Sequence, residues 1–296
     1  RIMKKLLLIL LCLPLMTLAQ ETYIPDANFE AHLEANGMGN GIANDNYVTT
    51  ENINTVAVLD VSSLSIFDLT GIEGFIALTT LKCENNQLAS LDLSQNAALT
   101  HLYCHANQFS SLDVSNNPLL VYLKCSNNQL TSLDVSSNTL LDNLNCSYNQ
   151  LDSLDVSNNT ALTTLYCKNN QLTSLNVSNN TALIYLVAQT NQLSNLDLSN
   201  NTALTVLTCS NNQFTSLDVR NGNNTNLYNF KTLNNPNLYC IDVDNVTWST
   251  ANWIIIDAQT QFNTNCSVAV GCTDTLACNY DSLATIDNNS CNYPTS

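Results

Sequence analysis

Two columns of side chains in this sequence have the chemistry to bind metals or to react, and the first is cysteine. Cysteine recurs every 21 residues with one gap, and no two of these cysteines form a CxxC pair. Side chains that project in parallel from neighbouring strands neither converge on a soft metal nor meet the geometry of a disulfide. Ala188 takes the cysteine place in one repeat, so a small apolar side chain is sufficient there. We therefore expect buried packing thiols at Cys83, Cys104, Cys125, Cys146, Cys167 and Cys209.

Aspartate forms the second column, and like charges on adjacent strands repel one another. Calcium binding along the row by hard oxygen ligands is one explanation. The preferred explanation needs no ion, because each carboxylate can accept hydrogen bonds from neighbouring Ser and Asn residues while solvent screens its charge. Asn176 interrupts the column, which otherwise comprises Asp92, Asp113, Asp134, Asp155, Asp197 and Asp218.

No arrangement in the chain indicates catalysis. His101 and His105 have no Ser or Cys nucleophile on a recognisable turn, and Cys104 between them points to the opposite face of its strand. Phosphate loops, dinucleotide fingerprints and the HExxH motif are missing from the sequence. We expect a protein that is not an enzyme and that needs no cofactor. Calcium is the one metal ion that remains a candidate.

Both columns are positioned by repeated coils. A coil at Val56 runs 22 residues to Leu78, and a degenerate ninth coil starts at Leu227. A fixed period of this length predicts a solenoid, in which each unit buries its apolar side on its neighbours. The other coils start at Leu78, Leu99, Leu120, Leu141, Leu162, Leu183 and Leu204.

The coil sequence also predicts its secondary structure. Positions 3 to 7 of each coil are predicted to form a short strand. The stacked strands form a parallel sheet with roughly 4.8 Å between coils. About nine coils therefore give a rod roughly 40 Å long. The alternating Leu-Asp-Val segment, such as residues 133–135, predicts a second short strand on the opposite side.

The repeat resembles a known family. LxxLxCxxNxL, as at residues 120–130, is similar to the leucine-rich repeat with cysteine in the third leucine place. The second half, LxSLDVSxN, resembles a 21-residue bacterial subclass found in secreted proteins of Bacteroidetes. The resemblance covers residues 56 to about 247 and implies a β-rich, right-handed curved rod.

The asparagine of the motif does not vary among the seven 21-residue repeats. A buried amide that satisfies the backbone of a turn and bonds to the next coil explains this without a ligand. The column comprises Asn86, Asn107, Asn128, Asn149, Asn170, Asn191 and Asn212.

The variable positions 3, 5 and 7 are the candidate binding residues. They lie on the expected concave face of the sheet and hold three of the five basic residues that follow residue 19. Tyrosine supplies contact area at low entropic cost, and Lys or His adds polar specificity. The plainer alternative is that these residue types simply suit exposed strands. The candidates are His101, Tyr103, His105, Tyr122, Lys124, Asn145, Tyr166, Lys168 and Tyr185.

The N-terminal part predicts export and a cap. Residues 1–19 combine Lys4 and Lys5 with a short apolar stretch and Ala19, as in a secretory signal peptide. Their removal leaves 5 basic and 24 acidic residues, a net charge of −19, which disfavours nucleic acid and anionic membranes as partners. No later segment is apolar enough to span a bilayer. Residues 20–55 read as an N-terminal cap, with Asp26 capping a short helix that buries Phe29 and Leu33.

The C-terminal part predicts a second cap and a small module. The solenoid of residues 56–239 is followed by a cap at residues 240–267, where Cys240 and Cys266 are the first choice for a disulfide in an oxidising compartment.

Residues 271–296 resemble the GCTDxxAxNYxxxATxDDGSC modules of secreted marine Bacteroidetes proteins. So small a unit needs a staple, for which Cys272 and Cys291 are the first choice, leaving Cys278 unpaired or paired with a neighbour. The resemblance implies candidate calcium ligands at Asp274, Asp281 and Asp287, although Asn288 and Asn289 depart from the pattern.

Together these patterns predict a secreted or cell-surface protein that captures a protein or polysaccharide partner on its concave sheet. A structural adhesin stalk, in which the repeats only set length, is the alternative. A stalk should tolerate changes on the concave face and fail when coils are deleted.

Overall fold

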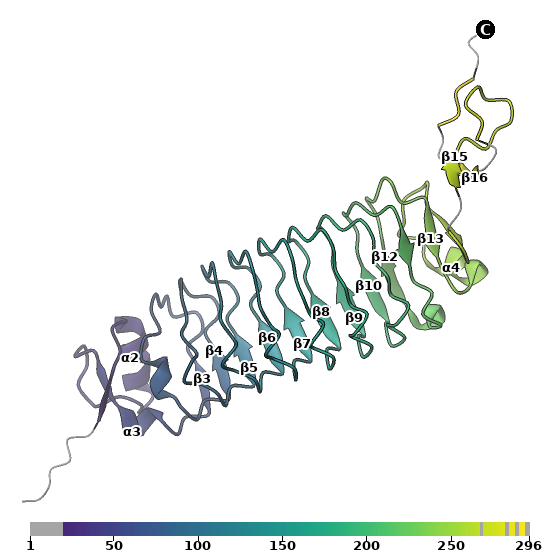
Figure 1. Cartoon of the computed structure of the whole chain (residues 1–296). Helices are drawn as coiled ribbons and strands as arrows, with labels where there is room; N and C mark the ends of the chain where they lie inside the picture. Colours follow the sequence, from purple (N-terminus) through teal and green to yellow (C-terminus); the bar gives the residue numbers. More distant parts are fainter. Residues whose placement is uncertain (1–19, 267–268, 282–283, 288–289, 294–296) are drawn as a thin grey trace, which may run out of the picture.

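A parallel sheet of nine short strands runs the length of the solenoid (Figure 1). The structure is a computed structural model, and it describes residues 20–266, 269–281, 284–287 and 290–293. Each strand pairs in register with the same three positions of the next coil. The prediction of a parallel β-rich solenoid is confirmed. The strands are β3 (Val58–Asp60), β4 (Thr80–Lys82), β5 (His101–Tyr103), β6 (Tyr122–Lys124), β7 (Asn143–Asn145), β8 (Thr164–Tyr166), β9 (Tyr185–Val187), β10 (Val206–Thr208) and β12 (Asn229–Lys231).

The strands are shorter than expected, but their ladder continues beyond them. The regular strand covers positions 3 to 5, while the N–H groups at positions 6 and 8 still donate to the next coil, as Cys104 does to Lys124 O at 2.9 Å. Leucine at position 4 and cysteine at position 6 are fully buried, as Leu102 and Cys104 show. Positions 3, 5 and 7 therefore face away from the core, since successive strand residues alternate between faces.

The invariant asparagine column is a hydrogen-bonded ladder, as predicted. Asn149 Oδ1 accepts from Leu130 N of the preceding coil at 3.0 Å. Its Nδ2 donates to Cys125 O of that coil and to Cys146 O of its own. Each such amide thus satisfies backbone groups of two coils, and the column is structural.

A second asparagine ladder was missed by the sequence analysis. Asn138 is fully buried, and its Nδ2 donates to Val114 O at 3.0 Å and Asn117 O at 2.9 Å. The final N of the LxSLDVSxN motif was its signal. The column comprises Asn96, Asn117, Asn138, Asn159, Asn180, Asn201 and Asn221.

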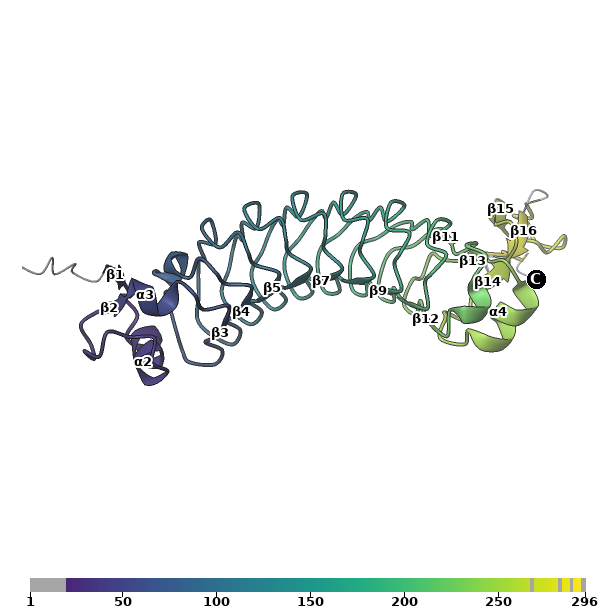
Figure 2. The same cartoon turned by 90° about the horizontal axis from the view of Figure 1, so that it is seen from below.

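This second ladder explains why the second strand was predicted wrongly for most coils. Residues 133–135 form no strand. Side-chain amides, rather than the N–H groups of a neighbouring strand, occupy Val114 O and Val135 O. These segments lie on the outer side of the arc (Figure 2). Residues of three successive coils, from Ser132 to Asn176, line a surface hollow of about 610 Å³ there.

A second sheet does form at the C-terminal end. It contains β11 (Leu217–Asp218), β13 (Cys240–Asp242) and β14 (Gln261–Asn263). There the backbone bonds directly between coils, with Val219 N donating to Asp242 O at 2.9 Å.

The N-terminal residues cover the first coil. They form β1 (Glu21–Tyr23), α2 (Ala27–Ala35), β2 (Tyr47–Thr49) and α3 (Thr50–Ile53), with the turn η1 (Ile72–Gly74) following the first coil strand. Asp26 caps α2 as predicted, because its Oδ1 accepts from Asn28 N and Phe29 N. Its Oδ2 also accepts from Phe67 N at 2.8 Å, which ties the helix to the first coil. Phe29 and Leu33 are fully buried.

The C-terminal cap adds one more turn of chain. It includes α4 (Val246–Asn252), which contacts the turn η2 (Asn224–Asn226) that precedes it. Thr232 N donates to Ile255 O of the cap at 3.0 Å. Trp253 stacks on Phe230 of β12 at 4.2 Å between ring centroids and covers the end of the core. A disulfide joins Cys240 to Cys266, the pair favoured by the sequence.

The small module that follows has its own short sheet. Strands β15 (Ala269–Gly271) and β16 (Ala284–Asp287) pair in parallel, and a disulfide joins Cys272 to Cys291. Cys278 is free and exposed. Asn288 and Asn289 lie outside the described residues, as does the predicted signal peptide at residues 1–19. Within the described part of the chain, no helix is long and apolar enough to cross a membrane.

Position 8 of each coil adopts a left-handed backbone conformation that leads to the first testable prediction. Asn fills this position in most coils, but Thr190 holds it at φ 56°. A β-branched residue is disfavoured there, whereas Asn tolerates it. We expect Thr190→Asn to raise the free energy of unfolding by about 1 kcal/mol, measured by urea denaturation. Asn169→Thr in the preceding coil should lower it by a similar amount, and a stabilised Asn169→Thr variant would contradict this account.

Candidate functional site

The candidate site is the concave face, which we define as the side chains at positions 3, 5 and 7 of the coils that carry β3 to β10 and β12. These strands lie along the inner side of the arc (Figure 2). All nine candidate residues fall on this face. Most are half-buried by their neighbours, and Tyr185 is the most open at 37% exposed. The nine are His101, Tyr103, His105, Tyr122, Lys124, Asn145, Tyr166, Lys168 and Tyr185.

Three of these residues form a stack of rings. Tyr122 lies between His101 and Tyr103, with ring centroids 6.1 Å and 4.8 Å away and planes tilted by 15° and 29°. The rings meet because the parallel pairing of β5 with β6 puts Tyr122 directly opposite His101. Burial, followed by the neighbouring Tyr103, raises the pKa of Tyr122 above its ordinary value, so the hydroxyl stays protonated at neutral pH. The stack is therefore an ordered group that presents aromatic edges and hydroxyls.

Two further contacts extend the aromatic surface. A hydrogen bond with Tyr228 raises the pKa of Tyr185. The Lys168 amine lies 4.9 Å from the centroid of the Tyr148 ring, a cation–π distance. Tyr148 and Tyr228 lie outside positions 3, 5 and 7, so the sequence analysis did not include them.

The row at position 7 contains polar atoms without partners. Glu84 Oε2 and His105 Nδ1 are buried and make no hydrogen bond among the described residues. Burial and then the nearby Lys124 lower the pKa of His105, so the imidazole is neutral at pH 7. Neutral imidazole can both donate and accept hydrogen bonds.

The aspartate column lies on the outer side of the arc and is held by local hydrogen bonds. Asp134 Oδ1 accepts from Ser136 N at 2.8 Å, and the same bond recurs along the column. Asn176 makes it too, with Ser178 N at 3.0 Å. Hydrogen bonds from Ser136 hold the pKa of Asp134 below its ordinary range. This geometry fits the preferred explanation, which needs no ion.

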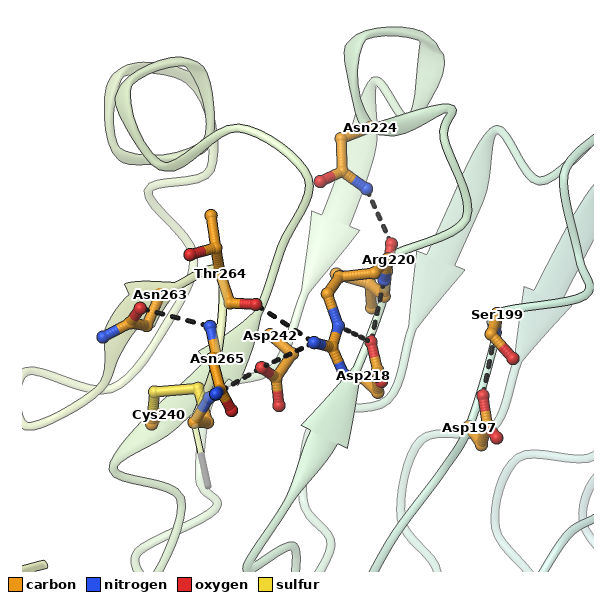
Figure 3. Close-up of polar contacts among 12 residues, drawn as sticks. Asp197, Ser199, Asp218, Arg220, Asn224, Cys240, Asp242, Asn263, Thr264 and Asn265 are labelled. Carbon is orange, nitrogen blue, oxygen red and sulfur yellow. Dashed lines mark hydrogen bonds and ion pairs between the residues drawn. A yellow bond between two sulfur atoms is a disulfide. The ribbon is translucent and has the colours of Figure 1, made fainter. Parts of the chain in front are cut away.

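At its C-terminal end the column is bridged by an arginine (Figure 3). Arg220 donates from Nε to Asp218 Oδ1 at 2.9 Å and from an Nη to Thr264 O at 3.0 Å. It also lies 3.6 Å from Asp242 Oδ1 of the next coil. One guanidinium therefore offsets the repulsion between two carboxylates.

The column makes stability depend on pH. The folded pKa values of Asp92, Asp113, Asp134 and Asp155 are lowered, so their contribution is present above the unfolded pKa of about 3.9 and is lost as pH falls through the folded values. We expect the free energy of unfolding to fall between pH 5 and pH 3, roughly. Asp134→Asn should reduce that fall, because Asn176 shows that an amide accepts the same bond. Urea denaturation of both proteins across this pH range measures the effect. An Asp134→Asn variant whose free energy of unfolding falls with pH as steeply as that of the wild type would contradict the prediction.

The cysteine column and the C-terminal aspartates offer little chemistry here. Burial raises the pKa of all six column thiols, that of Cys146 to about 12, so they are not thiolates at neutral pH. Asp274 accepts from Leu276 N and Tyr293 Oη. Among the described residues no three His, Cys, Asp or Glu side chains converge as a metal site, so calcium at Asp274, Asp281 and Asp287 stays a prediction.

With this geometry in place, the class of protein is clear from the solved structures. The chain is a leucine-rich-repeat solenoid, a fold that typically serves as a binding scaffold. Internalin C2 of Listeria monocytogenes shares this fold, with a TM-score of 0.62 and 22% identity over 76% of this chain and 98% of that one.

The repeats are also related in sequence to internalin J of the same organism. The functional domain of InlJ, which includes a cysteine ladder, matches with a TM-score of 0.57 and 33% identity over 83% of this chain and 62% of that one. Internalin J of Listeria monocytogenes serotype 4b (strain F2365) is 40% identical over 74 residues, 25% of this chain and 8% of that protein. The present chain thus spans less than two thirds of either relative. No protein-family model matches the sequence.

Proposed function

We propose that this protein is a secreted or cell-surface binding protein that captures a protein or polysaccharide partner on its concave face. The observation that carries the proposal is the ordered stack of His101, Tyr122 and Tyr103 on that face. Stacked rings are already immobilised, so a partner that contacts them incurs little further loss of side-chain entropy. Unpartnered atoms of Glu84 and His105 nearby add groups that a ligand can satisfy.

Export is supported by independent features. Disulfides join Cys240 to Cys266 and Cys272 to Cys291, and such bonds persist in oxidising compartments. The signal-like residues 1–19 and the resemblance to secreted bacterial repeats agree with this. Nucleic acid is disfavoured by the net charge of −16.

The test combines a glycan array with capture from the native surroundings. The wild type is compared with a variant in which Tyr103, Tyr122 and Tyr166 are all changed to Ala. We expect this variant to lose the partners that the wild type retains. A control variant changes three exposed apolar residues outside the face, Ile76, Leu119 and Leu140, to Ala.

The same experiment separates binding from a spacer role. If the triple tyrosine variant retains every partner while deletion of one whole coil, residues 141–161, abolishes function, the stalk interpretation holds and the binding proposal is wrong.

A further inference from the structure

We infer that the partner of the concave face is a linear anionic polysaccharide, whose acid groups are held by a row of lysines; this inference rests on the proposed function. Three independent features of the face carry it: where the cations lie, how they are spaced and what surrounds them.

The first feature is the segregation of positive charge. Every lysine after residue 19 lies on the concave face: Lys82, Lys124 and Lys231 at position 5, and Lys168 at position 7. Lys231 is not among the nine candidates predicted from the sequence, although the coil that starts at Leu227 places it at position 5. The remaining cation, Arg220, lies elsewhere in ion pairs with Asp218 and Asp242. Residues 20–296, with 5 basic and 24 acidic residues and a net charge of −19, thus gather all their lysines on one surface.

Three of these lysines are available to a ligand. Lys82 pairs with Asp60 at 3.5 Å, but Lys124, Lys168 and Lys231 make no salt bridge among the described residues. From residue 120 to residue 233, positions 3, 5 and 7 contain no carboxylate at all. Carboxylates on the face are confined to Asp60 and Glu84 near its N-terminal end. The lysines are half-buried, so their amines remain reachable.

The spacing of these amines favours a linear partner. Lys124 is on β6, Lys168 follows β8 and Lys231 is on β12, so they are separated by two and then three strand steps. At about 4.8 Å per step, the steps along the rod are roughly 10 Å and 14 Å. Lys124 and Lys231 share position 5, and Lys168 lies two residues further along its coil at position 7. The amines thus follow a band that crosses successive strands along the rod, which matches a linear polymer that carries repeated charges.

The chemistry between the lysines favours a sugar over a peptide. Aliphatic side chains are few on the face, which has only Val58, Val187, Val206 and Leu233. Its large side chains are tyrosines, which combine an aromatic ring with a polar hydroxyl. The other side chains are mainly hydroxyls and amides, such as Asn143, Asn145 and Gln189. Such groups match a polymer rich in hydroxyls, and the hydroxyls of the tyrosine stack add further donors.

Four polymers in matched pairs test the inference on the full chain. The pairs are polygalacturonate with its methyl ester, and dextran sulfate with dextran, so each pair shares a backbone and differs in charge. We expect the protein to bind at least one anionic polymer, more weakly as salt rises, and to bind neither neutral polymer. The first pair tests carboxylate and the second sulfate.

Lysine variants then locate the binding. Changing Lys124, Lys168 and Lys231 together to Gln should weaken binding roughly tenfold or more, whereas the same three changes to Arg should preserve it. Thermal melts confirm that both variants are folded.

Three results would overturn the inference: binding of neither anionic polymer, equal binding of the neutral polymers, or unchanged binding by the Gln variant. Polyglutamate is added as a fifth polymer: if the protein binds it and neither anionic polysaccharide, the inference is wrong and the partner is an acidic protein. If capture from the native surroundings still requires Tyr103, Tyr122 and Tyr166, the polysaccharide inference alone falls. If capture does not require these three tyrosines either, the proposed function is also wrong.

Discussion

Replacing Asn149 by Ala is expected to lower the free energy of unfolding by about 2 to 3 kcal/mol. The substitution leaves Leu130 N without an acceptor. It also removes one of the two amide donors of Cys125 O and of Cys146 O, which keep those of Asn128 and Asn170. These groups lie in a buried part of two coils, and each unsatisfied polar group costs about 1 to 3 kcal/mol. Urea denaturation followed by circular dichroism measures the change.

A neighbouring asparagine provides the control. Asn158 is exposed and donates one hydrogen bond, to Ser136 O at 3.3 Å. Asn158→Ala should therefore change stability by about 0.5 kcal/mol or less. Equal effects of the two substitutions would show that the column of Asn149 does not hold the coils together.

Replacing Tyr122 by Ala is expected to weaken partner binding by about 2 to 4 kcal/mol, roughly 30-fold to 1000-fold. Tyr122 is the ring that contacts both His101 and Tyr103, so its loss removes the stacking partner of each. Tyr122→Phe keeps the stack and should lose only the hydroxyl contribution, about 1 kcal/mol. Calorimetric titration of the captured partner gives both values.

Folding effects must be separated from binding effects in this pair. Tyr122 lies outside the core, so both variants should melt close to the wild type. A Tyr122→Ala variant that is fully folded and binds with wild-type affinity would place the partner away from the stack.

The repeating parts of the fold were predictable because equivalent positions of the seven repeats can be compared within the one sequence. The invariant column of Asn149 indicated a structural amide, and the alternation around Cys104 assigned the inward and outward faces correctly. The cap at Asp26 followed from local helix chemistry. These features depend on contacts within a coil or between equivalent positions of adjacent coils.

Features that depend on curvature were not predictable in the same way. Residues 133–135 alternate like a strand, but the outer side of the arc separates the coils and side-chain amides such as that of Asn138 replace the ladder. Among the described coils, backbone pairing on that side begins at Asp197 and continues through β11, β13 and β14.

The candidate site likewise has a part that the sequence predicted and a part that it did not. Its residues were found because positions 3, 5 and 7 vary from coil to coil, but the stack around Tyr122 depends on rotamers that spacing does not give. Tyr228 was missed because it lies at position 2 of its coil, and Lys231 because the variable positions were compared only among the seven regular repeats.

Hydroxyl-radical footprinting of the complex tests the central claim most directly, because it reads every face of the solenoid at once. The account predicts protection of Tyr103, Tyr122 and Tyr166 when the partner is bound, with Leu119 and Leu140 as reactive as in the free protein. Protection of Leu119 and Leu140 with the three tyrosines unchanged would contradict it.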